Sequence, residues 1–457
     1  MATPPTIPFP KTLYDRSTNL SESVLTEVAT ERIIEPARNI AGSLRLPGDK
    51  SISHRYALLG GLAHGTTRLT NFSSGADCAS SVACVAAMGA GVKRAADGAI
   101  EITGTDGHFH HSDAPLDCGN SGSTMRMLAG LLAPQRLAYT LVGDASLSRR
   151  PMERVRKPLA QMGADIHLTD GHAPVTIRGS KLHAIDYTTP VPSAQVKSAV
   201  LFAGLQASGT TTVREAVRTR DHSELALRAF GANVERTLDS VSIAGGQKVQ
   251  GIEAVVPGDM SSAAFFLCAA ALFPGSNLIF DDLGLNPTRA TLLDVLTALG
   301  AHIGVLNLEE KHGELVGTVQ VNAPQDGMGG TTVSGALAAQ LIDELPVLAA
   351  IAPYTKHGIR IRDAKELRVK ESDRIALVAR NLRAMGAEVE EFDDGLDVPG
   401  GQTLHAAEID SGGDHRIAMA FSVAALRARG HTVIRGAESA AISFPEFFDL
   451  LDRVAER

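Results

Sequence analysis

An internal repeat is the feature of this sequence that most constrains its fold. Five segments end an amphipathic helical pattern with a bulky apolar residue, continue with Gly-Ala, and then become rich in strand-forming residues. Glycine directly after a helix commonly adopts the left-handed conformation that ends it. We therefore expect five helices, each followed by a strand, to end at Gly89, Gly163, Gly231, Gly300 and Gly386.

A second pattern alternates with the first: a polar turn, a helix rich in alanine and leucine, another turn, and a β-rich run. These helices are apolar or small on nearly every face, so we expect them in the protein interior. With the first 40 or so residues left out, six copies give about 70 residues each, enough for two helices and several strands. An ordinary doubly wound α/β sheet stays open as an alternative. The copies begin near Ser51, Ser121, Ser193, Ser261, Leu341 and His415.

Length and composition limit the class of protein. A chain of 457 residues with 44% hydrophobic residues can form two or more domains, and no apolar run is long enough for a membrane-spanning helix. The first residues lack the basic start and apolar core of a secretory signal and indicate a loosely ordered extension. Four scattered cysteines fit reduced thiols in a cytoplasmic protein. A net charge of −8 and the lack of tryptophan argue against a nucleic-acid-binding protein.

The stretch "LRLPGDKSISHR", residues 44–55, resembles a phosphate-binding loop. The nucleotide-binding P-loop requires G-x-x-x-x-G-K-[ST], but here Asp49 separates Gly48 from Lys50, and Ser43 stands where the first glycine should be. The sequence therefore indicates an anion site of another kind.

Polar residues gather at the starts of the interior helices. Cations in a first helical turn oppose the helix dipole, but backbone N–H groups and that dipole both favour an anion there. A solvated helix cap with incidental charge is the alternative at any single helix. The residues concerned are Lys50, Ser51 and Arg55, then Asn120, Ser121 and Gly122, then Ser193 and Gln195, and finally Asp414, His415 and Arg416.

Two further segments carry clustered charge. In "LRVKESDR", Lys370 and Arg374 lie four residues apart on an expected helical face beside Glu371, a pattern that also fits a salt-bridged surface helix. "SLSRRPMERVRK" is a basic loop that is either solvated or an anion clamp. "HFHH", residues 108–111, lacks companion ligands at metal-binding spacing, which favours an exposed loop. On an acidic chain, a cluster of Lys50, Arg55, Arg150, Lys370, Arg374 and Arg416 would suit a transferase that joins two anionic substrates.

Six motifs occur in the order found in the 5-enolpyruvylshikimate-3-phosphate synthases, from about residue 38 to the C-terminus: "LPGDKSISHR", "GNSGSTMR", "RRPM", "RVKESDR", "GDHRIAMAF" and "SFPEFF". The resemblance implies an α/β enolpyruvyl transferase fold of two domains, each with three βαβαββ-like repeats and partly buried helices. It places residues 1–47 as an extension and first segment of domain 1, residues 48–257 as domain 2, and residues 258–457 as the rest of domain 1. The crossings would fall at Pro47–Gly48 and Pro257–Gly258, with the active site in the cleft between the domains.

The resemblance also implies a reaction. The 5-hydroxyl of shikimate 3-phosphate adds to C2 of phosphoenolpyruvate, C3 is protonated, and phosphate leaves the tetrahedral intermediate. This is a 3-phosphoshikimate 1-carboxyvinyltransferase step in chorismate and aromatic amino acid biosynthesis. No metal or organic cofactor, nucleic acid or membrane is implied, and a cytoplasmic monomer is expected.

By motif, the resemblance assigns roles to particular residues. Asp343 would act near the 5-hydroxyl and Glu371 as the acid for C3, with Lys370 or Lys50 assisting. The shikimate 3-phosphate set is Lys50, Ser51, Arg55, Ser193, Ala194, Gln195, Arg220, Asp343 and Lys370. The phosphoenolpyruvate set is Lys50, Asn120, Gly122, Arg150, Gln195, Arg374 and Arg416.

The chain departs from the better-known branch of that family. Ile442 replaces a lysine before the "SFP" turn, and Ala194 replaces a serine between Ser193 and Gln195. The sequence resembles more closely the divergent, class II-like branch that includes glyphosate-tolerant enzymes. Tolerance there is associated with alanine where this chain has Gly122, so we expect glyphosate to bind, with a potency that depends on Ile442.

Three rival functions are open on the sequence alone. A sister enzyme transfers enolpyruvate to UDP-N-acetylglucosamine, but it usually carries a loop cysteine that "GDASLSRRPM" lacks. A catalytically silent binding subunit would be free to lose some of Lys50, Asp343, Lys370, Glu371 and Arg416, all of which are present. RNA 3′-terminal phosphate cyclase shares related repeats but needs nucleotide-binding features that are absent here.

Overall fold

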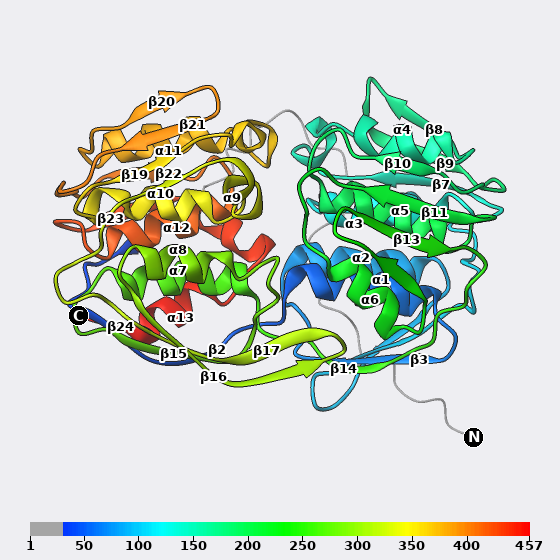
Figure 1. The fold of residues 1–457 in the computed structure, drawn as a ribbon, viewed down its shortest axis with the longest axis horizontal. Helices are drawn as coiled ribbons and strands as arrows, with labels where there is room; N and C mark the ends of the chain where they lie inside the picture. Colours follow the sequence, from blue (N-terminus) through cyan, green and yellow to red (C-terminus); the bar gives the residue numbers. More distant parts are fainter. Residues whose placement is uncertain (1–30) are drawn as a thin grey trace, which may run out of the picture.

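The repeats form two lobes that lie side by side in the computed structural model, which describes residues 31–457 (Figure 1). One group of buried apolar residues runs from Ile52 to Val256, and the other comprises Ile34 to Leu46 and Met260 to Val454. We call residues 48–257 the first half, and residues 31–47 with 258–457 the second half. Residues 1–30 of the expected extension lie outside the described residues.

The helices alternate between interior and outer positions, as the two sequence patterns predict. The interior helices are α1 (Lys50–Leu62), α3 (Gly122–Leu132), α5 (Ala194–Gly204), α7 (Met260–Ala271), α10 (Leu345–Ile351) and α12 (His415–Ala425). The others are α2 (Ala76–Ala87), α4 (Glu153–Gln161), α6 (His222–Ala229), α8 (Thr291–Ala298), α9 (Gly335–Gln340), α11 (Arg374–Ala384) and α13 (Phe447–Val454). Short 3₁₀ turns are η1 (Leu147–Arg149), η2 (Ala352–Tyr354), η3 (Lys365–Val369) and η4 (Ala437–Ile442).

The strands form six small sheets, which excludes one continuous doubly wound sheet. In the first half the hydrogen-bonded orders are β14 (Glu253–Val255), β3 (Thr66–Thr70), β5 (Ile100–Thr103), β4 (Gly91–Arg94); β6 (Leu116–Asp117), β7 (Ala138–Val142), β9 (His172–Arg178), β8 (Asp165–Thr169); and β10 (Asp186–Thr188), β11 (Thr210–Arg214), β13 (Ser240–Ala244), β12 (Val234–Arg236). In the second half, where β14 is not used, they are β16 (His302–Lys311), β17 (Glu314–Asn322), β15 (Asn277–Gly284), β2 (Asn39–Arg45), β24 (Ala455–Glu456); β18 (Thr331–Val333), β19 (Ile359–Ile361), β21 (Gly395–Val398), β20 (Glu390–Phe392); and β1 (Glu31–Ile34), β23 (Thr432–Arg435), β22 (Glu408–Asp410).

Five of these sheets share one pairing pattern: one parallel pair followed by two antiparallel pairs. All five Gly-Ala glycines follow an outer helix and have φ between 86° and 103°. A side chain with a Cβ is strained in this region, so glycine lets each helix end and its strand begin. The sequence prediction of these helix ends is confirmed.

The chain passes between the halves at two adjacent segments. Strand β2 precedes α1 in the chain but pairs with β15 of the second half, whereas β14 precedes α7 but pairs with β3 of the first half. Gly48 and Gly258 form an antiparallel bridge between the two passages. A Cβ at Gly48 would lie 1.9 Å from the carbonyl oxygen of Asn71, so only glycine allows this close approach.

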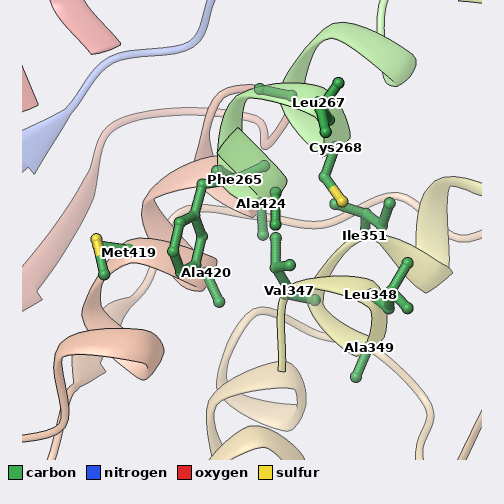
Figure 2. Close-up of a cluster of buried hydrophobic side chains, with 14 of the residues drawn as sticks. Phe265, Leu267, Cys268, Val347, Leu348, Ala349, Ile351, Met419, Ala420 and Ala424 are labelled. Carbon is green, nitrogen blue, oxygen red and sulfur yellow. The ribbon is translucent and has the colours of Figure 1, made fainter. Parts of the chain in front are cut away.

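The interior helices are buried on nearly every face. In the second half, side chains of α7, α10 and α12 pack against one another, among them Phe265, Val347 and Ala420 (Figure 2). Full burial of a large apolar side chain contributes about 1.5–3 kcal/mol, so this packing fixes the helices and the positions of their ends. The interior placement predicted from composition is confirmed.

One helical prediction is wrong. Lys370 and Arg374 do not share a helical face, because Lys370 and Glu371 lie in the segment between η3 and α11, and the helix begins at Arg374. Asp373 caps α11 by accepting a hydrogen bond from the backbone N–H of Ala376, which starts the helix three residues later than the charge pattern indicates.

Other sequence expectations agree with the described residues. The His108–His111 segment is without regular structure and exposes its histidines, and no cluster of three metal-ligating side chains occurs in residues 31–457. All four cysteines are buried and free. No helix within the described range has the length and apolar character to cross a membrane.

Candidate active site

Capped helix ends bring the polar motifs together. Asp49, Ser121, Ser193, Asp259 and Asp414 cap five interior helices by accepting hydrogen bonds from backbone N–H groups of the first turn. The remaining N–H groups and the positive end of each helix dipole favour an anion nearby. The sequence prediction of polar helix starts is thus confirmed at these positions.

A cavity of about 350 Å³ lies between the halves. Its walls come from the start of α5 and the loop before α6 on one side, and from the segments around α9 and η3 on the other. Six of the predicted shikimate 3-phosphate residues line it: Ser193, Ala194, Gln195, Arg220, Asp343 and Lys370.

Three ion pairs cross this cleft, and in each the cation comes from the first half and the carboxylate from the second. They are Arg220–Asp343 at 2.9 Å, Arg154–Glu366 at 2.7 Å and Arg150–Glu371 at 3.2 Å. Opposite charges facing each other hold the two walls together without filling the cavity.

The predicted phosphoenolpyruvate residues form a connected network beside the cavity. Arg150 donates to the side-chain oxygen of Asn120 at 2.7 Å and contacts Glu371. Arg374, only 1% exposed, donates to Glu371 at 2.6 Å and to Asp414 at 2.8 Å. Two arginines therefore share one glutamate, an arrangement that a doubly charged ligand could replace.

Asp343 sits at the meeting point of four cations. Its carboxylate lies 3.5 Å from Lys370 and 3.6 Å from Arg374, and Arg416 donates to its backbone oxygen at 2.7 Å. Burial favours the neutral acid, but Lys370, Arg416 and Arg220 outweigh burial and hold the pKa of Asp343 well below its usual value. Asp343 is therefore ionised in this state.

Glu371 is held ionised in the same way. Burial opposes ionisation, but Arg374 and Arg150 bring the pKa of Glu371 well below its usual value. The two carboxylates assigned to proton transfer are thus both anions while the cleft holds only protein charges.

Other predicted residues lie deeper or nearby. The Lys50 ammonium is 3.1 Å from Asp77. Arg55 is 4% exposed and donates to the backbone oxygen of Ser51 and to two serine hydroxyls, so its guanidinium does not line the cavity. At Gly122, an added Cβ would lie 2.7 Å from Nη1 of Arg126.

Arg126 and Glu366 are cavity residues that the sequence interpretation missed. Arg126 donates to the side-chain oxygen of Gln195 at 2.6 Å, and burial together with the charge of Arg150 lowers its pKa to about 10. Its place four residues after Gly122 on one helix gave a usable signal, because residues four apart share a helical face. Glu366 carried no such signal, since its partner Arg154 is remote in sequence.

Comparison with known proteins now identifies the family. Residues 34–451 match the family model of EPSP synthase (3-phosphoshikimate 1-carboxyvinyltransferase). The chain belongs to the EPSP synthase family. It is 65% identical over 424 residues to the 3-phosphoshikimate 1-carboxyvinyltransferase of Koribacter versatilis, covering 93% of this chain and 99% of that protein. The protein of the same name from Solibacter usitatus is 51% identical over 437 residues, covering 93% and 100%.

Solved structures agree with the family assignment. An EPSP synthase from Acinetobacter baumannii, 38% identical, superposes with a TM-score of 0.82 and covers 93% of this chain and 98% of that chain. The enolpyruvyl transferase NikO from Streptomyces tendae, 18% identical with a TM-score of 0.75 and the same coverage, shares the fold. The predicted α/β enolpyruvyl transferase fold is thereby confirmed.

Proposed function

We propose how the cleft of this EPSP synthase family member performs its reaction. The chain is a 3-phosphoshikimate 1-carboxyvinyltransferase, a transferase of the shikimate pathway that leads to aromatic amino acids. The observation that supports the residue assignment is the cleft itself: cations of one half face carboxylates of the other around an open cavity.

Shikimate 3-phosphate binds in the cavity. Ser193, Ala194, Gln195 and Arg220 contact it from the first half, while Asp343 and Lys370 approach from the second. The ionised Asp343 accepts the hydrogen bond of the 5-hydroxyl and takes up its proton as the hydroxyl oxygen attacks. Lys370, 3.5 Å from Asp343, keeps that carboxylate oriented. Ser51 supports this subsite through its backbone bond to Arg55.

Phosphoenolpyruvate binds in the neighbouring network. Two unit negative charges about 4 Å apart repel by about 4 kcal/mol at an effective dielectric near 20, so both substrates need fixed cations around them. Those that we assign to phosphoenolpyruvate are Lys50, Arg150, Arg374 and Arg416, together with the uncharged Asn120, Gly122 and Gln195.

Binding of this substrate prepares Glu371 as an acid. When the substrate anion pairs with Arg150 and Arg374, Glu371 shares the cations that lower its pKa, so the pKa rises and the carboxyl can carry a proton. Glu371 then protonates C3, and Lys50 or Lys370 assists. The same cations stabilise the phosphate as it leaves the tetrahedral intermediate.

The two halves act as the two domains of this reaction. We propose domain 2 at residues 48–257 and domain 1 at residues 1–47 with 258–457. The exchange of β2 and β14 between sheets and the Gly48–Gly258 bridge support a hinge at these two passages.

We place the chain in the divergent, class II-like branch, because Ala194 and Ile442 stand at the two positions that separate it from the better-known branch. Glyphosate competes with phosphoenolpyruvate at the arginine network, and Gly122 leaves room for it beside Arg126. The enzyme works as a cytoplasmic monomer. Chromatography with light scattering tests the monomer, and inhibition that phosphoenolpyruvate relieves tests glyphosate binding.

Phosphate release from phosphoenolpyruvate is the direct test, measured with a chelator present and either shikimate 3-phosphate or UDP-N-acetylglucosamine as acceptor. Release only with shikimate 3-phosphate supports the proposal. Release only with the sugar nucleotide would assign the chain to the sister activity. Folded protein that releases phosphate with neither acceptor would be a silent binding subunit.

A further inference from the structure

A buried lysine behind the cavity has no part in the reaction just described. Lys197 lies on α5, three residues after the helix starts at Ala194, and its side chain is 1% exposed. Its ammonium lies 2.8 Å from Glu215 and 2.9 Å from Glu224, both buried as well. Burying three ionised groups is costly unless they are paired, so the cluster requires a reason beyond packing.

The cluster keeps its charges despite burial. Burial lowers the pKa of Lys197, but Glu224 and Glu215 outweigh it and raise the pKa above the usual value, so the ammonium is charged. Burial raises the pKa of Glu224, whose second carboxylate oxygen has no hydrogen-bond partner among residues 31–457. Replacing the lysine with a neutral side chain would leave two buried carboxylates unpaired.

The cluster surrounds the ends of the loop that carries Arg220. Glu215 directly follows β11, and Glu224 lies in the first turn of α6, so the seven-residue connection 215–221 runs between two groups held by one ammonium. Lys197 also lies 3.5 Å from the backbone oxygen of Thr219, the neighbour of Arg220, and the Thr219 hydroxyl hydrogen-bonds to Glu215.

The next residue on α5 holds the same region from the side. Ser198 lies 2.5 Å from the hydroxyl of Ser223 on α6 and accepts a hydrogen bond from Arg55 at 2.9 Å. The loop reaches the cavity from this support, where Thr219 and Arg220 line the wall and Arg220 contacts Asp343.

We propose that Lys197 is a positioning residue for shikimate 3-phosphate: through Glu215 and the backbone of Thr219 it fixes the 215–221 loop so that Arg220 reaches across the cleft to Asp343. The inference rests on the proposed placement of this substrate beside Arg220. Phosphoenolpyruvate binds to the network around Arg150 and Arg374, which the loop does not touch, so the effect belongs to one substrate.

The test is Lys197→Met, which removes the charge and keeps the length of the side chain. We expect the KM for shikimate 3-phosphate to rise about 10- to 100-fold, the scale at which a misplacement of about 1 Å affects enzymes, with less than about a twofold change in the KM for phosphoenolpyruvate. Leu201→Ala, one turn further along α5 and fully buried, is the control for lost stability, and Lys181→Met controls for an exposed lysine of the same half.

A double-mutant comparison separates positioning from simple destabilisation. If Lys197 acts through Arg220, adding Lys197→Met to Arg220→Ala should raise the KM for shikimate 3-phosphate no further. Equal changes in both KM values, a profile like that of Leu201→Ala, or an additive effect in the double variant would overturn the proposal.

A ligand-free crystal structure of Lys197→Met distinguishes this inference from the proposed function. Displacement of the 215–221 loop and loss of the Arg220–Asp343 contact would support positioning, and an unchanged loop would overturn it. Failure of the unmodified protein to bind shikimate 3-phosphate in calorimetry would instead refute the substrate assignment, and with it the role of Lys197 toward that substrate.

Discussion

The two halves of the molecule use one repeat design but contribute different chemistry to the cleft. Each half buries three interior helices that begin near the cleft residues, and each builds sheets with the same pairing pattern. Across the cavity, however, the first half supplies arginines and the second half supplies the carboxylates that face them. Architecture and charge are therefore set independently, because the buried helix faces determine the fold and the residues at the helix starts determine the chemistry.

The difference has a functional consequence. A wall of cations can bind anions but is poor at moving protons at neutral pH, because arginine stays protonated. Carboxylates held ionised by those cations can accept a proton once a substrate takes over part of the positive charge. The division of charge between the halves lets cleft closure bring the binding groups and the proton-transfer groups together.

The largest expected effect comes from neutralising a carboxylate of the second half. Glu371→Gln and Asp343→Asn keep the side-chain size but remove the group that transfers a proton, so we expect kcat to fall about 10²-fold or more. Steady-state phosphate release measures it. Glu366→Gln is the matched control, since it removes a cleft carboxylate of the same half without a proton-transfer role. Turnover unchanged in Glu371→Gln or Asp343→Asn would show that the division of roles between the halves is wrong.

Buried histidines of the two halves offer a second comparison. His54 on α1 hydrogen-bonds to Ser81 at 2.8 Å, whereas neither ring nitrogen of His415 on α12 has a hydrogen-bond partner among the described residues. Burial and the charge of Lys50 lower the pKa of His415 to about 4. The unfolded chain binds a proton on this histidine below about pH 6.5 while the folded protein does not, so stability falls as the pH drops from about 6.5 to about 4.

Urea unfolding measured across that pH range tests the second comparison. The difference in pKa corresponds to about 3 kcal/mol, which we expect His415→Gln to remove from the pH dependence of the unfolding free energy. His54→Gln is the parallel variant in the first half, where burial and Lys50 also hold the pKa of the histidine well below its usual value. An identical pH profile in His415→Gln and the unmodified protein would contradict this account.

The sequence predicts the scaffold better than the details of the cleft. Helix ends at the Gly-Ala glycines and helix starts at Ser121 or Ser193 depend on local preferences, which a sequence displays directly. The start of α11 was misjudged because the charges at Lys370 and Arg374 fit helical spacing, while the Asp373 cap decides where the helix begins.

Contacts across the cleft could not be predicted from spacing. Arg154 and Glu366 are far apart in the chain, and their pairing depends on how two separately folded halves face each other. Arg126 shows the same limit: its helix was predicted, but its reach to Gln195 depends on the packing of α3 against α5. Such contacts follow from tertiary arrangement and not from local sequence.

A smaller effect is expected where a cation wall meets a missing side chain. At Gly122→Ala the new Cβ would lie 2.7 Å from Nη1 of Arg126 and 3.4 Å from Nη1 of Arg150, so both guanidinium groups must shift. Overpacking of this kind costs about 1–3 kcal/mol, and we expect the KM for phosphoenolpyruvate to rise about tenfold and glyphosate inhibition to weaken. The KM for shikimate 3-phosphate should change little. A larger change for shikimate 3-phosphate would place Gly122 on the wrong side of the site.

The smallest expected effect concerns the Arg154–Glu366 pair, which has the same charge polarity as the other cross-cleft pairs but is more exposed. Their side chains are 37% and 40% exposed, so solvent and salt screen the attraction. A cycle of Arg154→Ala, Glu366→Ala and the double variant, followed by urea unfolding, should give a coupling energy of about 0.2–1 kcal/mol that shrinks at 1 M salt. A coupling that is several times larger and insensitive to salt would mean that this pair, and not the buried arginine network, holds the two halves closed.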